Sequence, residues 1–108
     1  MKVQIHCQGK LRSAALVNWA RHQLAMNLSR FSEGIKSIRV RLVDTNGVRG
    51  GNDKRAEAVV SLRDGSVITT EVRDEDAYRS FEWLARQLRF QIQRRVERLR
   101  GRRRVRYA

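Results

Sequence analysis

Hydrophobic and polar residues alternate over four short stretches of the chain, and this two-residue period is typical of half-buried β-strands. The pattern predicts strands over residues 2–8, 35–45, 55–63 and 66–73. Asp64-Gly65 lies between the last two strands and favours a type I′ hairpin turn of two residues. The glycine-rich segment 46–52 predicts a loop between the second and third strands.

Two longer stretches follow the 3.6-residue period of an amphipathic helix. The first helix is expected over residues 11–31 with Ser13 as N-cap, and its apolar stripe is Leu16, Ala20, Leu24, Leu28 and Phe31. The second is expected over residues 75–100, capped by an aspartate of the segment 74–76 and ended by Gly101. Its apolar stripe is Tyr78, Phe81, Ala85, Leu88, Ile92, Val96 and Leu99. A helix of that length measures about 39 Å, so its last turns should extend past the sheet.

The order β-α-β-β-β-α predicts an α+β fold, a two-layer sandwich with a four-stranded mixed sheet and both helices on one face. The first crossover makes the first two strands parallel, and the hairpins are antiparallel. A chain of 108 residues fits one domain, which we place at residues 1–100. Residues 101–108 are predicted to be a basic, disordered tail.

The charge of the chain indicates a polyanionic partner. Lysine and arginine number 24 against 11 acidic residues, a net charge of +13. Residues 77–108 hold 11 arginines against Glu82 and Glu97, so this third of the chain contributes +9 of that total. Arginine predominates, and its planar guanidinium suits bidentate phosphate contacts and stacking on bases. We therefore expect nucleic acid to bind at the C-terminal third.

The polar face of the second helix combines arginine with aromatic residues. Arg79, Trp83, Arg86, Phe90 and Arg94 lie opposite the apolar stripe. Three hypotheses account for the two exposed rings: contact with RNA, contact with a protein partner, or packing within the chain.

The sequence contains no pattern of residues that is typical of a catalytic or metal-binding site. Cys7 is on the inward face of its strand and His6 on the outward face, which indicates a buried inert thiol and a solvated imidazole. No nucleophile elbow, phosphate-binding loop or dinucleotide motif occurs. We therefore expect no enzyme activity, no cofactor, no metal and no small-molecule substrate. The chain has no run of about 20 apolar residues, so no membrane association is expected, and a single cysteine suits the cytoplasm.

Several segments together resemble the ribosome hibernation promoting factor family, also called ribosome-associated inhibitor A or sigma-54 modulation proteins, in its short form. The resemblance covers residues 1–100. It is carried by the β-α-β-β-β-α order, by the segment 44–55 (DTNGVRGGNDKR), and by Asp76-x-Tyr78 followed by Phe81, Leu84 and Leu88 in a basic helix. The chain departs from the family at Met26, Asn27, Val48, Trp83 and Phe90.

The resemblance implies a fold related to double-stranded-RNA-binding domains and a monomer that lacks the dimerisation domain of the long form. It implies binding to 16S rRNA in the decoding region of the small ribosomal subunit, which blocks the tRNA and mRNA sites under stress or in stationary phase. The candidate rRNA-binding residues are Arg21, His22, Arg30, Arg79, Trp83, Arg86, Arg89, Phe90, Arg94, Arg95 and Arg98. The alternatives are a general RNA- or DNA-binding protein off the ribosome, and a protein-interaction module that uses Trp83 and Phe90.

Overall fold

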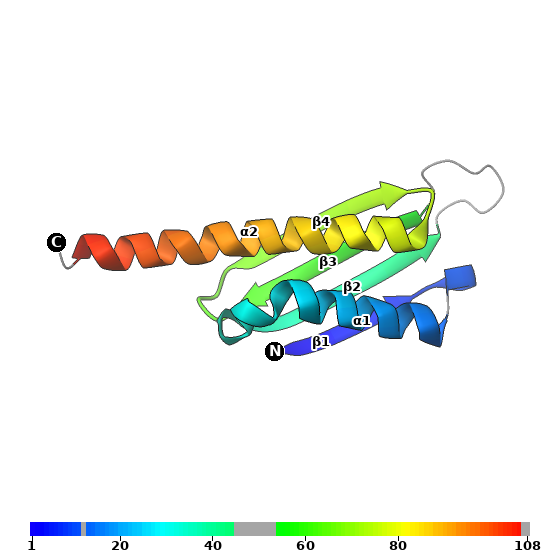
Figure 1. The fold of residues 1–108 in the computed structure, drawn as a ribbon, viewed down its shortest axis with the longest axis horizontal. Coiled ribbons are helices and arrows are strands. Elements are labelled where there is room, and N and C mark those ends of the chain that lie inside the picture. Colours follow the sequence, from blue (N-terminus) through cyan, green and yellow to red (C-terminus); the bar gives the residue numbers. More distant parts are fainter. Residues whose placement is uncertain (12, 45–53, 107–108) are drawn as a thin grey trace.

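The computed structural model describes residues 1–11, 13–44 and 54–106, without the side chains of residues 10 and 99–106. Its elements in chain order are β1 (Lys2–Cys7), the 3₁₀ turn η1 (Gly9–Leu11), α1 (Ala14–Leu28), the 3₁₀ segment η2 (Ser29–Gly34), β2 (Ile35–Asp44), β3 (Lys54–Leu62), β4 (Val67–Asp74) and α2 (Ala77–Arg106) (Figure 1). The predicted loop at 46–52 lies outside the described residues.

The four strands form one mixed sheet in the order β1-β2-β3-β4. β1 pairs with β2 in parallel, while β2 with β3 and β3 with β4 are antiparallel. Both helices cover the same face of this sheet (Figure 1). The predicted α+β sandwich and its strand directions are therefore confirmed.

The core lies between the helices and the inward face of the sheet. Its fully buried members include Leu24, Leu28, Ile38, Val40, Leu42, Val60, Phe81, Leu84, Leu88 and Ile92. Tyr78 departs from the expected stripe, because its side chain is 45% exposed. Its ring lies at the border between the helices, 4.8 Å from the ring of Trp19 and edge-on to it.

Helix α1 has the predicted N-cap, Ser13, but it begins later and ends earlier than expected. The Oγ atom of Ser13 accepts a hydrogen bond from the backbone N–H of Leu16 at 3.2 Å, which satisfies one of the free donors of the first turn. The α-helix stops at Leu28, and Phe31 is buried from the tighter η2 segment instead. The expected continuous helix over 11–31 is therefore shorter at both ends.

The last backbone pair of the β3–β4 hairpin is Leu62 with Ser66, which leaves residues 63–65 as a three-residue loop. The prediction of a two-residue type I′ turn is therefore wrong. Leu62 N–H donates to the carbonyl of Ser66 at 2.9 Å, and Gly65 N–H donates to the carbonyl of Leu62 at 3.1 Å. A type I′ turn needs two residues with positive φ, and here only Gly65 has one, at 92°. The Asp64 carboxylate instead accepts hydrogen bonds from the N–H and the hydroxyl of Ser66. These bonds stabilise the longer loop.

Helix α2 continues through Gly101 to Arg106, so the predicted end at Gly101 is wrong. One glycine in a helix costs about 1 kcal/mol relative to alanine, but it removes no backbone hydrogen bond. At 30 residues, α2 is about 45 Å long. Its C-terminal part extends past the sheet, as expected from its length (Figure 1). The division into a domain at 1–100 and a tail at 101–108 stays a prediction.

Candidate nucleic-acid interface

A basic groove runs between the two helices. It is lined by Gln23 and Asn27 of α1 and by Glu82, Arg86, Arg89 and Phe90 of α2, and encloses about 470 Å³. The buried residues of α2 face the sheet, so the positions beside them turn toward α1 or toward solvent. Two guanidinium groups and two side-chain amides thus meet in one groove, the set of donors that a phosphate chain needs.

A second basic groove lies on the other side of α2, between this helix and β4. Gln91, Arg94, Arg95 and Arg98 line it from the helix, and Val67, Ile68 and Thr69 line it from the strand. Arg95 forms a long ion pair, because its Nε atom lies 3.8 Å from the carboxylate of Asp64. The distance is long for an exposed ion pair, so this pair leaves the Arg95 charge available.

Two aromatic rings stand on the solvent side of α2, and one of them, Phe90, also lines the first groove. Trp83 is 49% exposed and Phe90 is 61% exposed. The guanidinium of Arg86 lies 5.5 Å from the Trp83 ring, and that of Arg94 lies 5.5 Å from the Phe90 ring. The described residues therefore do not bury either ring. The exposure of Trp83 and Phe90 is compatible both with RNA contact and with protein contact.

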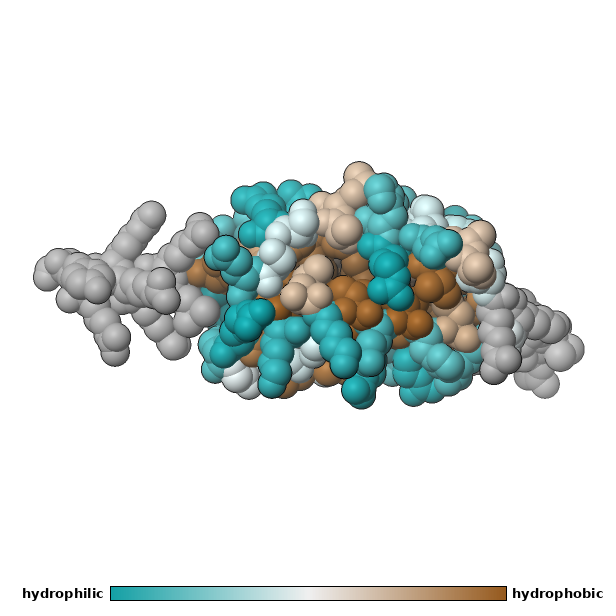
Figure 2. Space-filling model, turned by 90° about the horizontal axis from the view of Figure 1, so that it is seen from below, coloured by the Kyte–Doolittle hydropathy of each residue, from teal (hydrophilic) through white to brown (hydrophobic). Residues whose placement is uncertain are grey.

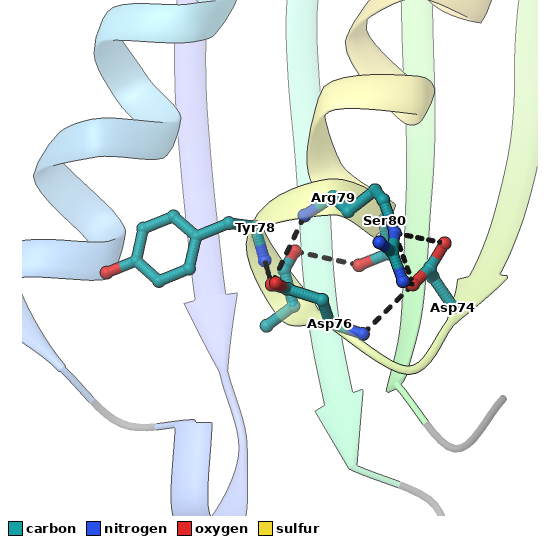
Figure 3. A network of polar contacts seen from close by, with 6 residues as sticks. Asp74, Asp76, Tyr78, Arg79 and Ser80 are labelled. Carbon is teal, nitrogen blue, oxygen red and sulfur yellow. Dashed lines mark hydrogen bonds and ion pairs between the residues drawn. The ribbon is translucent and has the colours of Figure 1, made fainter. Parts of the chain in front are cut away.

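The side chain of Arg79 is held by an ion pair with Asp74, close to the start of α2 (Figure 3). Its guanidinium binds both carboxylate oxygens of Asp74, with distances of 2.8–3.0 Å. Asp76 caps the helix, because its carboxylate accepts the N–H of Tyr78 at 2.8 Å. The hydrogen bond from Arg79, followed by that from the Asp76 N–H, lowers the pKa of Asp74. The same pair raises the pKa of Arg79. Arg79 is thus the least available of the candidate cations.

This pair predicts a pH-dependent contribution to stability. The pKa of Asp74 is lower in the folded protein than its ordinary value of 3.8, so the contribution is complete above pH 3.8 and is lost as the pH falls through the folded-state pKa. We expect Asp74→Asn to reduce the free energy of unfolding at pH 7, and the difference from wild type to shrink well below pH 3.8. Urea titrations at both pH values measure it. Glu75→Gln, at a neighbouring exposed carboxylate, is the control, and an equal loss in both variants would contradict the assignment to the Asp74–Arg79 pair.

The side chains of the candidate rRNA-binding residues of α1 and η2 lie apart from one another. The Nη1 atom of Arg21 donates to the carbonyl of Val3 at 3.2 Å, so this side chain lies over the edge strand β1 and away from α2. His22 is exposed on α1, and Arg30 lies in η2 with its guanidinium 5.2 Å from the Phe31 ring. The structure therefore gathers six candidates into the two grooves and leaves Arg21, His22, Arg30, Arg79 and Trp83 outside them. The six are Arg86, Arg89, Phe90, Arg94, Arg95 and Arg98.

Sequence reasoning missed the polar partners in these grooves. Gln23 and Asn27 are one turn apart on α1, and Asn27 donates to the carbonyl of Gln23 at 2.8 Å. Their spacing on the side of α1 next to its apolar stripe is the signal that marks residues facing a second helix. Gln91 could be found in the same way, since it flanks the buried Leu88 and Ile92.

Among the described residues, the grooves contain no cysteine and no cluster of metal ligands. Cys7 is buried on the inward face of β1, and burial raises the pKa of its thiol, which keeps it protonated and weakly nucleophilic. Within the described ranges, His, Cys, Asp and Glu form no group of three that could hold a metal ion. Among the same residues, no helix is both long and apolar enough to cross a membrane.

Two helices on one face of a mixed sheet, with basic grooves beside the longer helix, define a class: small, basic, two-layer α+β proteins. Within it, the family model described as "Sigma 54 modulation protein / S30EA ribosomal protein" matches residues 3–100. The chain belongs to this family of ribosome-associated modulation proteins, which is not a known enzyme family, and the resemblance drawn from the sequence is confirmed.

Two solved structures share the fold. A ribosomal subunit interface protein from Coxiella burnetii has a TM-score of 0.73 and 24% identity, over 90% of this chain and 99% of that one. The N-terminal domain of Thermus thermophilus Protein Y has a TM-score of 0.70 and 23% identity, over 87% of this chain and 98% of that one. No curated protein matches the chain by sequence.

Proposed function

We propose that this protein is a ribosome hibernation factor that binds 16S rRNA in the decoding region of the small ribosomal subunit. It would act by occupying the tRNA and mRNA sites during stress or stationary phase, with no chemical step. Its site of action is the cytoplasm, where it reaches the subunit as a monomer. The family membership and the basic α2 surface both support this proposal.

The observation that carries the proposal is the convergence of five arginines on the two grooves beside α2. Arg86 and Arg89 lie in the groove shared with α1, and Arg94, Arg95 and Arg98 lie in the groove shared with β4. Grooves on both sides of one helix can together hold the phosphates of one RNA segment that lies across the helix. Trp83 and Phe90 then offer ring faces to unpaired bases, since base–aromatic stacking is worth about 1–3 kcal/mol per base.

A second candidate function is protein binding through the same two rings. Trp83 and Phe90 are the large apolar side chains that stand most clearly on the outer side of α2, and aromatic residues are frequent at the centres of protein interfaces. The arginines stacked on both rings favour an anionic ligand over an apolar one.

Sedimentation of the purified protein with small ribosomal subunits tests the proposal. We expect it to co-sediment at low salt and to lose affinity steeply as salt rises, with a log–log slope of roughly −0.7 to −0.9 for each phosphate contacted. Translation in a reconstituted reaction should fall in proportion to the occupied subunits. Absence from the subunit fraction at low salt would reject the ribosomal function, and salt-independent capture of a protein would favour the second candidate.

A further inference from the structure

The face of the sheet opposite the helices carries its own basic surface, on β1 and β2. Lys2 and His6 of β1 and Arg39 and Arg41 of β2 all have exposed side chains at outward positions. The parallel register sets Arg41 beside His6 and Arg39 beside Gln4. No acidic residue occurs at the outward positions of these two strands from residue 2 to residue 42. We call Lys2, His6, Arg39 and Arg41, with Gln4 between them, the open-face basic surface.

On the other half of the same face, the charges of arginine and glutamate side chains are paired with one another. On β3 and β4, Glu57 lies 3.1 Å from Arg55, and Glu71 lies 3.7 Å from Arg55 and 3.0 Å from Arg73. Glu57 is opposite Arg41 in the strand register, but its carboxylate is directed to Arg55. Among the described residues, Arg39 and Arg41 therefore have no ion-pair partner, and their charge faces solvent.

A hollow of about 610 Å³ lies at the β1 side of this surface. Its polar lining is Gln4, His6, Arg21, Arg39 and Arg41. Arg21 reaches it from α1, since its guanidinium is held at the edge of β1 by the Val3 carbonyl. Figure 2 views the molecule from the side of β1 and α1, where hydrophilic side chains border a central hydrophobic area. Three guanidinium groups, an amide and an imidazole at one hollow make a donor set that fits phosphate oxygens.

We propose that the open-face basic surface is a second RNA-backbone site, so that the protein contacts two separate RNA segments, one on each side of the molecule. The inference rests on the proposed function only for the class of ligand. The two surfaces are separated by the sheet and the helix layer, and one helix alone is about 10 Å across. The helix and the sheet together are thicker than the Debye length of about 8 Å at physiological salt, so phosphates bound at one surface are largely screened from the other.

The charge selects RNA over a second copy of the chain. Two copies meeting through this surface would bring Arg39 and Arg41 of one against those of the other, and like charges in contact are unfavourable. The ligand is a phosphate backbone and not a base, because among the described residues the outward positions of β1 and β2 carry donors and no Phe, Tyr or Trp ring.

The test is the number of short single-stranded RNA oligonucleotides bound by the full chain, measured by native mass spectrometry and by salt titration. Wild type is expected to bind two, and Arg39→Glu with Arg41→Glu only one. The salt slope should fall by roughly 1.4, for two lost single-strand contacts. Lys36→Glu with Arg63→Glu is the control with the same change of charge, placed at one end of β2 and β3. It should keep both oligonucleotides.

The same substitutions in a protein already carrying Arg86→Glu and Arg94→Glu isolate the open face. Residual RNA binding of that protein is expected to disappear when Arg39 and Arg41 are also changed. Two bound oligonucleotides and an unchanged slope in the Arg39/Arg41 variant would overturn the inference, and so would an equal loss in the control. A wild type that binds two oligonucleotides but does not sediment with small subunits would reject the ribosomal function and leave this inference standing.

Discussion

Replacing Arg86 and Arg94 together by glutamate is expected to weaken association with the small ribosomal subunit severely. The two arginines line different grooves, and each is stacked on one of the exposed rings. The substitution removes both cation–π contacts and puts negative charge where phosphate would lie. A hydrogen bond to a charged group contributes about 1.5–3 kcal/mol, so losing two lowers affinity by roughly two to four orders of magnitude.

Both side chains are exposed, so the substitutions should change the free energy of unfolding by less than about 0.5 kcal/mol each. Co-sedimentation gives the affinity, and circular dichroism with urea titration checks the fold. The Lys36→Glu/Arg63→Glu protein is again the control for net charge. Normal association of the double variant would show that the α2 grooves are not the ribosome-binding surface.

Phe81→Ala is expected to lower the free energy of unfolding by about 3–5 kcal/mol, the range for truncating a buried phenylalanine. Phe81 is fully buried under α2, and its ring meets that of Trp19 edge-on at a centroid distance of 5.7 Å. The alanine leaves a cavity between α1, α2 and the sheet, and a small domain has only about 5–15 kcal/mol of stability in total.

Phe90→Ala is the matched control, since it removes the same side chain from the same helix at a position 61% exposed. Urea titration should give a change of under about 0.5 kcal/mol for Phe90→Ala, while its affinity for RNA should fall by the value of one stacked base, about 1–3 kcal/mol. Similar unfolding energies for the two variants would mean that the two faces of α2 are wrongly assigned.

The fold was largely predictable because its elements differ in hydrophobic period. Alternation marks the strands, and the Leu16–Leu28 and Phe81–Ile92 stripes mark the helices. The errors occur where local signals are weak or shared. Asp-Gly suits more than one hairpin loop, and the Asp64–Ser66 hydrogen bonds favour the longer one. Gly101 breaks the apolar pattern without breaking the backbone hydrogen bonds of the helix.

The candidate site was predictable only in part. The exposure of Trp83 and Phe90 follows from the helical period, and so does the placing of arginine around them. The sequence could not show that Arg79 is bound by Asp74, or that Arg21 leaves the α1 surface for the edge of β1. Both outcomes depend on how a long side chain finds an acceptor on another element.

By itself, the sequence determined the order of the elements, the inward face of each strand, the basic C-terminal third and the family. These properties depend on residue type and on spacing within single elements, which packing does not alter. Only the tertiary structure decided which cations stand together: two grooves beside α2, and a separate open-face basic surface on β1 and β2. The reason is physical, because a groove or a charged face is made by side chains from different elements. Its members are set by strand register and helix packing.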